Sequence, residues 1–299
     1  MPVSSPCLVD TDRYERIVYG WMDSPRSDSF ATTVRITDPW VSIELAADTT
    51  PSPDYAIREA RGRLLVGPQE RIEPALAEAA AGLAGLSMTG GFTRNAAETL
   101  GNRPGVEYFV DAAVEVARLA RQITRLPEQV VTARMREGAI GVWRLDMAGW
   151  VDLPASCYAY RPESEALFKE RAVRTAAPAR IYSPAVGAAG VFNRTKVLRI
   201  ERCQGHLLLA HSMFDEVHSF QIWYRLDLAS STIVGAGSMT PRLPYLGICN
   251  DPQRNITALI GQTVGPTLRQ QMRGLIGGMS GCAQLFELTA DLLKLLSFS

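Results

Sequence analysis

The chain has 299 residues and 46% of them are hydrophobic, which is enough to bury a sizeable core and predicts two domains. Its 31 basic and 31 acidic residues give a formal net charge of zero, so no overall field favours nucleic acid or an anionic membrane surface. Five irregularly spaced cysteines do not form the pattern of a disulfide framework, and we expect a reducing, cytoplasmic location.

The N-terminal part of the chain carries no evident targeting segment. Residues 1–16, MPVSSPCLVDTDRYER, lack the apolar core of a secretory signal. The longest weakly polar run, AAAGLAGLSM at 79–88, is far shorter than the roughly 20 residues of a membrane span. We therefore expect no membrane contact.

The window 83–119 recurs in the second half of the chain at one constant offset. Glycines and leucines match without a gap: Leu83 with Leu259, Gly85 with Gly261, Gly101 with Gly277, Gly105 with Gly281 and Leu119 with Leu295. Charges match in the same register: Asp111 with Glu287, Glu115 with Asp291 and Arg118 with Lys294. Matching glycines imply matching backbone turns, and matching charges imply the same helix face.

Upstream of this window the offset becomes smaller. RLLVG (63–67) matches STIVG (231–235), and RI (35–36) matches RI (199–200). A changing offset indicates small insertions in loops. We therefore interpret the chain as one ancestral domain that was duplicated in tandem.

Residues 123–179 lie between the two copies. Pro127, Pro154 and Pro162 interrupt this segment, and its end, RTAAPARIYSP, is typical of a joining sequence. We interpret it as the tail of the first copy followed by a linker.

The second copy begins with four β-prone runs, TKVLRI, HLLLAH, HSFQIWYRLDL and STIVGAGSM, which predict an antiparallel meander. In SFQIWYRLD, the alternation places Phe220, Ile222, Tyr224 and Leu226 on one face of a strand. Helices are expected over 253–262, 267–276 and 280–297, the last of them capped by Ser280.

Strands followed by helices in each copy predict an α+β fold. We expect two tandem copies of one domain, at 1–175 and 176–299, each an antiparallel sheet followed by helices. A pseudo-twofold axis is expected to relate the two copies.

The second copy resembles an uncharacterised bacterial domain family. In that family a strand histidine and a pre-helix cysteine precede a Gly-Cys-Thr-His-Leu helix start, which is followed by Glu-Leu. Here the helix start reads GCAQLFEL, with Cys282 kept, Ala283 in place of the threonine and Gln284 in place of the histidine. His218 and Cys249 resemble the strand histidine and the pre-helix cysteine.

The first copy resembles the same family less closely. GFTRNAAETLG (91–101) is similar to its helical stretch, and CYAYR (157–161) is similar to the segment that follows. Val106 and Tyr108 stand at the cysteine and histidine places of the helix start, and Asp54 stands near the His218 place. The resemblance implies the fold and a degenerate polar set, and it implies no reaction.

Cys282 is the first candidate for chemistry. At a helix N-terminus, unpaired N–H groups and the helix dipole lower the pKa of a thiol, which then can act as a nucleophile or a metal ligand. The alternative is that Cys282 packs as a small hydrophobic residue, because Val106 takes the same place in the first copy.

All three histidines lie in one segment, CQGHLLLAHSMFDEVH (203–218), whose spacings suit zinc ligands. On a strand, however, His206 and His211 face opposite ways. The resemblance implies a four-ligand site of His218, Cys249, Cys282 and the Gln284 place, and an amide is a poor zinc ligand. We therefore expect no metal and no other cofactor.

Motifs for other chemistries are absent. The sequence has no Walker loop, no strand-to-helix GxGxxG and no nucleophile elbow. Glu287, Asp291 and Lys294 share a helix face, which we interpret as a solvated row of charges. Aromatic segments such as SCYAY and WYRL are suited to line an apolar pocket.

By elimination, the leading hypothesis is a cofactor-independent enzyme of cyclase, isomerase or lyase type. Its substrate is expected to be an apolar, partly unsaturated or polycyclic small molecule, in a biosynthetic context. His218 is the expected acid/base group, Cys282 and Gln284 are polar contacts, and Tyr108 is a donor from the other copy.

Two alternatives stay open. One is a non-catalytic small-molecule-binding or accessory module, and the other is a metal-dependent enzyme that uses His218, Cys249 and Cys282. A deep cavity reached by His218 or Tyr108 favours an enzyme over a binding module. The sequence leaves a homodimer open as well.

Overall fold

The computed structural model describes residues 3–4 and 11–298. The first half comprises β1 (Val3–Ser4), β2 (Arg13–Ser24), β3 (Phe30–Thr37), β4 (Ser42–Thr49), β5 (Ile57–Val66), α1 (Ala75–Ala79), the 3₁₀ helix η2 (Ala80–Leu83), α2 (Phe92–Leu100) and α3 (Val106–Leu119). The middle segment comprises α4 (Glu128–Met135), α5 (Ala139–Gly149), η3 (Tyr158–Tyr160), α6 (Ser164–Glu170), β6 (Arg174–Thr175) and η4 (Ala179–Ile181). The second half comprises β7 (Ala188–Cys203), β8 (His206–Asp215), β9 (Ser219–Asp227), β10 (Thr232–Arg242), β11 (Tyr245–Leu246), η5 (Asp251–Leu259), α7 (Leu268–Leu275), η6 (Gly278–Ser280), α8 (Ala283–Leu293) and β12 (Ser297–Phe298).

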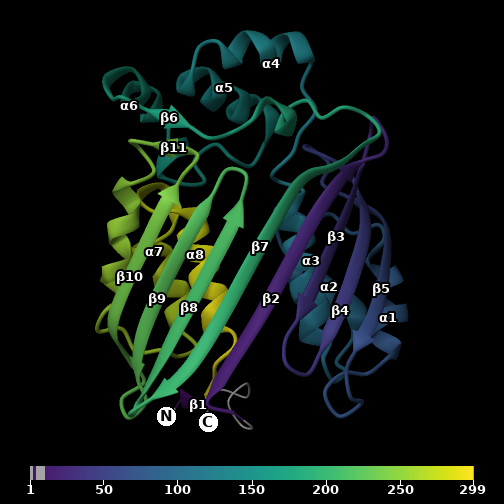
Figure 1. Cartoon of the computed structure of the whole chain (residues 1–299), viewed down its shortest axis with the longest axis vertical. Coiled ribbons are helices and arrows are strands. Elements are labelled where there is room, and N and C mark those ends of the chain that lie inside the picture. The colour runs from purple at the N-terminus through teal and green to yellow at the C-terminus, as the bar shows by residue number, and fades with distance from the viewer. Residues whose placement is uncertain (1–2, 5–10, 299) are drawn as a thin grey trace.

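The main sheet is antiparallel and runs through both halves in the order β10-β9-β8-β7-β2-β3-β4-β5 (Figure 1). Its two central strands, β2 and β7, pair in continuous register from Arg13 with Glu201 to Met22 with Phe192. The α+β class and the antiparallel meanders are therefore confirmed. The sheet is shared by the segments 1–175 and 176–299.

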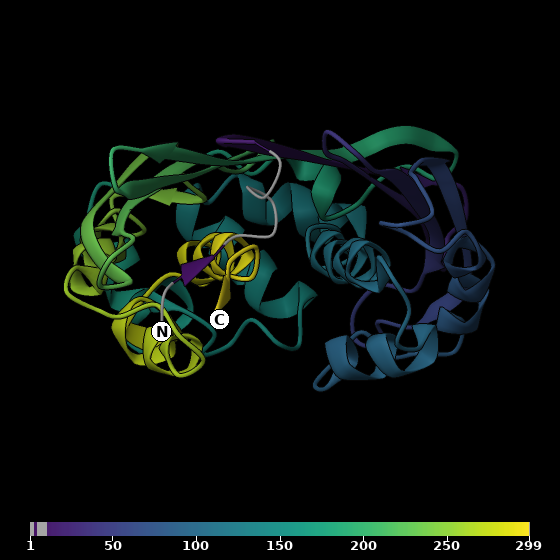
Figure 2. The same cartoon turned by 90° about the horizontal axis from the view of Figure 1, so that it is seen from below.

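The strands form as the alternation predicts. In β9, Phe220, Ile222, Tyr224 and Leu226 are at most 2% exposed, whereas the residues between them are partly or fully exposed. The helices gather on one side of the sheet, as the view from below shows (Figure 2). The buried strand face and the helices therefore enclose one core, because each needs the other to remove its apolar side chains from water.

One sequence match is not supported by the strand order. Residues 35–36 lie on β3, and residues 199–200 lie on β7, which occupies the centre of the sheet. The match of 63–67 with 231–235 pairs β5 with β10, the two edge strands of the sheet. Of the two short matches upstream of the helices, one therefore joins strands in equivalent places of the sheet and the other does not.

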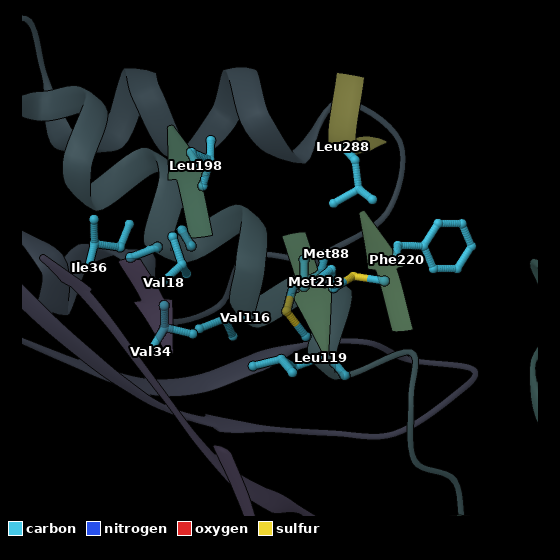
Figure 3. Close-up of a cluster of buried hydrophobic side chains, with 14 of the residues drawn as sticks. Val18, Val34, Ile36, Met88, Val116, Leu119, Leu198, Met213, Phe220 and Leu288 are labelled. Atoms are coloured by element: carbon cyan, nitrogen blue, oxygen red, sulfur yellow. The ribbon is translucent and has the colours of Figure 1, made fainter. Parts of the chain in front are cut away.

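The core beneath the central strands is continuous between the halves. Val18 and Val34 of the sheet lie beside Val116 of α3, whereas Met213 and Phe220 lie near Leu288 of α8 (Figure 3). All six side chains are buried. Truncating one such side chain to alanine generally costs about 2 to 5 kcal/mol.

The middle segment is not a linker. Its helices α4, α5 and α6 form a layer across one end of the sheet (Figure 1). This layer is fixed by packing, since Trp143 and Tyr245 both pack against Phe168, with ring centroids 5.6 and 4.9 Å away. Backbone bonds from Thr124 to Ile181 and from Leu126 to Tyr182 tie its two ends together. Pro127, Pro154 and Pro162 lie before or between the helices of this segment, so they separate short helices and do not mark a linker.

The last helix starts later than predicted. Helix α8 begins at Ala283 with Cys282 as its N-cap residue, and Ser280 lies in the preceding turn η6 and makes no cap. Gly281 is required at this place because a Cβ would lie 2.2 Å from the carbonyl oxygen of Ile276. The predicted helix 267–276 is α7, and the predicted helix 253–262 is the 3₁₀ helix η5.

The predicted row of solvated charges on α8 is wrong for Asp291, which belongs to a buried ion cluster, whereas Glu287 is partly exposed and Lys294 is exposed. Asp291 is 6% exposed and accepts two hydrogen bonds from Arg118 of α3, at 2.7 and 3.1 Å. Glu287 pairs with the same guanidinium at 3.1 Å. Lys196 of β7 lies beneath both helices, 2.5 Å from Glu115 of α3 and 3.6 Å from Asp291. The interface between α3 and α8 buries Asp291, Glu115 and Lys196, which a single-helix pattern cannot reveal.

Candidate functional site

A small cavity lies where the middle segment meets the second half. Its volume is about 130 Å³. The walls come from α5 and η3 of the middle segment, from the β8–β9 turn, and from the start of α8. Its lining is largely apolar and includes Trp150, Leu153, Ile181, Val217, Phe220 and Leu243. Three of the predicted site residues, His218, Cys282 and Gln284, line it together with Cys249.

His218 is held by the turn between β8 and β9. The Asp215 carboxylate accepts hydrogen bonds from the backbone N–H groups of Val217 and His218, at 2.8 and 2.6 Å, which closes the turn. The same carboxylate lies 3.1 Å from Nδ1 of His218. This bond leaves Nε2 as the ring nitrogen available to a ligand, and within the described residues Nε2 makes no hydrogen bond.

Arg194 completes this arrangement from the central strand β7. Its Nε and Nη2 atoms lie 2.8 and 2.7 Å from Oδ2 of Asp215. Burial opposes ionisation of Asp215, but His218 and Arg194 outweigh it and hold the pKa of this carboxyl well below its usual range. The sequence indicated Asp215 only as part of a metal spacing, and no local signal pointed to Arg194.

Asp146 is an acidic residue on the cavity that the sequence patterns do not indicate. The hydroxyls of Tyr160 and Tyr182 donate to its carboxylate at 2.7 and 2.5 Å, and Tyr245 donates as well. Burial raises the pKa of Asp146 to about 6, against the three phenol hydrogen bonds and the attraction of His218. Its segment, GVWRLDMAGW, had been assigned to a linker, so no pattern drew attention to it.

The cysteines on the cavity do not have the activated character predicted for Cys282. Cys157, Cys249 and Cys282 all line the cavity. Burial raises the pKa of Cys157 to about 11, and burial also raises the pKa values of Cys249 and Cys282. Desolvation therefore outweighs the helix N-terminus, and these thiols stay protonated near neutral pH. Cys203 is free and exposed, and Cys7 lies outside the described residues.

The residues proposed as metal ligands are not grouped for that purpose. Within residues 3–4 and 11–298, no three His, Cys, Asp or Glu side chains are placed to hold one metal ion. His211 is fully buried with Nδ1 2.9 Å from the carbonyl oxygen of Leu288, and burial lowers its pKa to about 4. His206 lies near the end of the same strand, where Nδ1 is 3.2 Å from the carbonyl oxygen of Gln204.

Two buried polar atoms on the cavity have no protein partner. The indole N–H of Trp150, a side chain 3% exposed, makes no hydrogen bond with the described residues, and neither does Oε1 of Gln284. Both side chains line the cavity. An unpaired buried donor or acceptor costs about 1 to 3 kcal/mol, which a ligand or water can recover. Neither atom has appreciable accessible surface, so a shift of the side chain is needed before either can bond to a molecule in the cavity.

Tyr108 does not belong to this cavity. Its hydroxyl donates to Asp38, and its ring packs 4.6 Å from the Arg16 guanidinium, in the first half of the molecule. Asp38 accepts bonds from the N–H groups of Trp40 and Val41, the same turn that Asp215 makes before His218. Val41 is the third residue after Asp38, as His218 is the third residue after Asp215. Val41, and not Asp54, therefore takes the position in its turn that His218 takes in the other.

The comparisons with known proteins support the resemblance at a coarse level. Residues 200–296 match the family model described as "Protein of unknown function (DUF2889)", which extends from the end of β7 through α8. No curated protein and no solved structure matches the chain. The second half is therefore similar to an uncharacterised family. Separately, no helix within the described ranges is both long and apolar enough to cross a bilayer.

Proposed function

We propose that this protein is a cofactor-independent isomerase that moves a proton within a small, largely apolar, unsaturated carbonyl compound. The proposal rests on one observation: His218, with Nδ1 on the Asp215 carboxylate, lines a small, largely apolar cavity. An imidazole oriented by a carboxylate is a general base near neutral pH. The reaction would take place in the His218 cavity.

The proton transfer needs only His218. Neutral Nε2 takes a proton from the carbon next to the carbonyl group, and the C–H electron pair moves into a conjugated enolate. The imidazolium then returns the proton to the carbon two positions further along, so the double bond shifts and no atom is gained or lost. Asp215 at Nδ1 and the nearby Asp146 carboxylate both stabilise the imidazolium while it exists.

The unpaired polar atoms supply the electrostatic part of the reaction. A shift of the Trp150 ring would let its N–H, which has no partner within the described residues, donate to the oxygen on which the enolate charge develops. Gln284 offers Oε1 to a hydroxyl of the substrate or to bound water. Cys282 has a raised pKa and serves as wall, not as nucleophile.

The cavity volume limits the reactive part of the substrate. A cavity of roughly 150 Å³ in an engineered protein holds one benzene molecule. At about 130 Å³, the cavity of this protein takes a single ring or a chain of similar size. A polycyclic substrate fits only if most of it lies outside the cavity.

The first experiment uses cyclohex-3-en-1-one, a single-ring ketone. The protein should convert it to the conjugated isomer faster than buffer does, and proton NMR in deuterated buffer follows both conversion and exchange. His218→Gln should lower the rate by about 100-fold, in the range expected for a lost general base. His206→Gln is the matched control, because His206 lies on the same sheet outside the cavity. Equal rates for the two variants would exclude His218 as the base.

A binding module without catalysis is the second candidate, and the satisfied surroundings of Asp146 favour it. Three tyrosine hydroxyls already donate hydrogen bonds to the Asp146 carboxylate, so it is not free to act on a ligand. In that case phenol should bind to the protein and no ring ketone should isomerise or exchange. The NMR experiment separates the two functions, because binding shifts protein resonances whether or not a reaction follows.

We also propose that the chain is a tandem duplication with a pseudo-twofold axis at its centre. Arg118 of α3 pairs with Glu287 of α8 at 3.1 Å, and in return Lys294 pairs with Asp111 of α3 at 2.7 Å. Reciprocal contacts of this kind are the mark of a twofold interface. Strand order supports the same idea, since β2 to β5 and β7 to β10 both run outward from the centre. Superposition of the two halves in experimental coordinates is the test.

A further inference from the structure

A second hollow lies against the His218 cavity, on the helical side of the molecule. It is an open groove of about 520 Å³ between the helices of the two halves. Its walls come from α3 and the residues before α2 in the first half, and from α7 and α8 in the second half. Helices α3 and α8 lie side by side beneath the middle of the sheet (Figure 2). A groove of this size takes a molecule much larger than one ring.

The groove and the cavity adjoin. Arg121, Ser156 and Ala283 line both of them. Arg121 is fixed at this junction, since Nη1 donates to the carbonyl oxygen of Ala117 at 2.8 Å and Nη2 to that of Met88 at 2.6 Å. One molecule can therefore place one end in the cavity and the other in the groove.

The groove is positively charged although the chain as a whole is neutral. Its charged side chains are Arg118, Arg121, Arg269, Arg273 and Glu287. Arg118 and Glu287 pair with each other, and Arg121 pairs with Asp152 at 2.6 Å.

Two positive charges remain uncompensated. Arg269 and Arg273 are exposed on α7, and neither has an ion-pair partner among the described residues. Like charges four residues apart on a helix repel each other. Two arginines four residues apart on one helix, with no acid between them in the sequence, match a doubly charged phosphate better than a neutral or singly charged group.

We propose that the groove binds the phosphate-bearing end of a substrate whose unsaturated apolar end enters the His218 cavity. This inference deepens the proposed function and rests on it for the reactive end. Arg269 and Arg273 bind the phosphate, and Arg121 marks the passage between the two parts. Binding of a remote group in the groove holds the reactive end in place, which is how enzymes use parts of a substrate that do not react.

The test compares two probes that share the phenylbutyl group and differ in the phosphate, 4-phenylbutyl phosphate and 4-phenylbutan-1-ol. Calorimetry at low ionic strength should give a dissociation constant roughly tenfold lower for the phosphate. The double variant R269Q/R273Q should lose this preference while the affinity for the alcohol stays within about twofold. Arg225→Gln is the matched control, an exposed arginine on β9 outside the groove. Inorganic phosphate should weaken binding of the phosphate probe and leave the alcohol unaffected.

The outcomes separate the two proposals. Equal affinities for both probes in the unmodified protein overturn the anion site and leave the isomerase proposal standing. If R269Q/R273Q still prefers the phosphate probe, the phosphate does not bind at Arg269 and Arg273, and the proposed location of the anion site is wrong. If neither probe binds, the inference fails together with the cavity as a ligand site. His218→Gln should keep the phosphate preference while it loses isomerisation, because His218 is not part of the groove.

Discussion

Lys196 at the centre of the sheet provides a quantitative test of the buried ion cluster. Its side chain is 1% exposed, and Nζ lies 2.5 Å from Glu115 and 3.6 Å from Asp291. Lys196→Met keeps an unbranched side chain that is one heavy atom shorter, and it removes the charge. Both carboxylates retain Arg118 as a partner, so the loss should be smaller than the roughly 3 to 5 kcal/mol of a fully orphaned buried ion.

The magnitude follows from the pKa of Glu115. Burial opposes its ionisation, but Lys196, Arg118 and Arg194 outweigh burial and lower the pKa from 4.5 to about 2. That difference corresponds to about 3 kcal/mol of stability at neutral pH, at roughly 1.4 kcal/mol for each tenfold change in proton affinity. Lys196 is the largest of the three attractions, but burial lowers the pKa of Lys196 itself, so its removal also relieves the cost of burying an ammonium group and should cost less than about 3 kcal/mol at pH 7.

The stability difference between the wild type and Lys196→Met should depend on pH. A carboxyl with a lowered pKa in the folded state stabilises the fold above its unfolded pKa and loses that contribution as pH falls. The difference in free energy of unfolding between the wild type and Lys196→Met should therefore become smaller between pH 4.5 and pH 2, where Glu115 takes up a proton. Urea denaturation at several pH values measures it.

The control is Lys169→Met, because Lys169 pairs with Glu165 at the surface with 61% of its side chain exposed. It should cost less than about 0.5 kcal/mol. A gap for Lys196→Met that is constant from pH 7 to pH 3 would show that lost packing, and not lost charge, causes the destabilisation. The ion-cluster reasoning would then be wrong.

Three further predictions concern the cavity and its surroundings. Because the pKa of Asp146 is raised from 3.8 to about 6, its ionisation costs stability above pH 4. The free energy of unfolding of the wild type relative to Asp146→Asn should fall by up to about 3 kcal/mol from pH 4 to pH 7, and urea denaturation measures it. Iodoacetamide at pH 8 should label exposed Cys203 at least about tenfold faster than Cys282, by peptide mass spectrometry, and equal rates would contradict the raised thiol pKa. Gly281→Ala should cost more than about 2 kcal/mol and weaken phenol binding because its Cβ meets backbone at the start of α8, whereas Gly265→Ala, with open space around it, should be nearly neutral.

Sequence patterns were sufficient where the signal is local. Alternation in β9 identified the buried strand face, and the predicted helix 280–297 contains α8, which runs from Ala283 to Leu293. Backbone conformation and burial on one face depend mainly on neighbouring residues, which is why the α+β class and the antiparallel strands could be predicted.

The site was only partly predictable. The family resemblance selected His218, Cys249, Cys282 and Gln284, and all four line one cavity. Tyr108 was wrongly assigned to the site, since its expected place depends on how the two halves meet. It bonds to Asp38 in its own half, because the turn after β3 brings that carboxylate to it.

The sequence by itself determined the strands and helices of the second half and indicated that two similar sets follow each other, but it did not indicate the helices α4, α5 and α6 of the middle segment. Only the tertiary structure decided what those elements enclose. The middle segment folds across one end of the sheet and brings Asp146 onto the same cavity as His218, far away in the chain. The same packing buries the thiols and the ion cluster, and burial reverses the character that the helix N-terminus and the charge pattern predicted. Desolvation depends on every neighbour in space, and no window of the sequence contains that information.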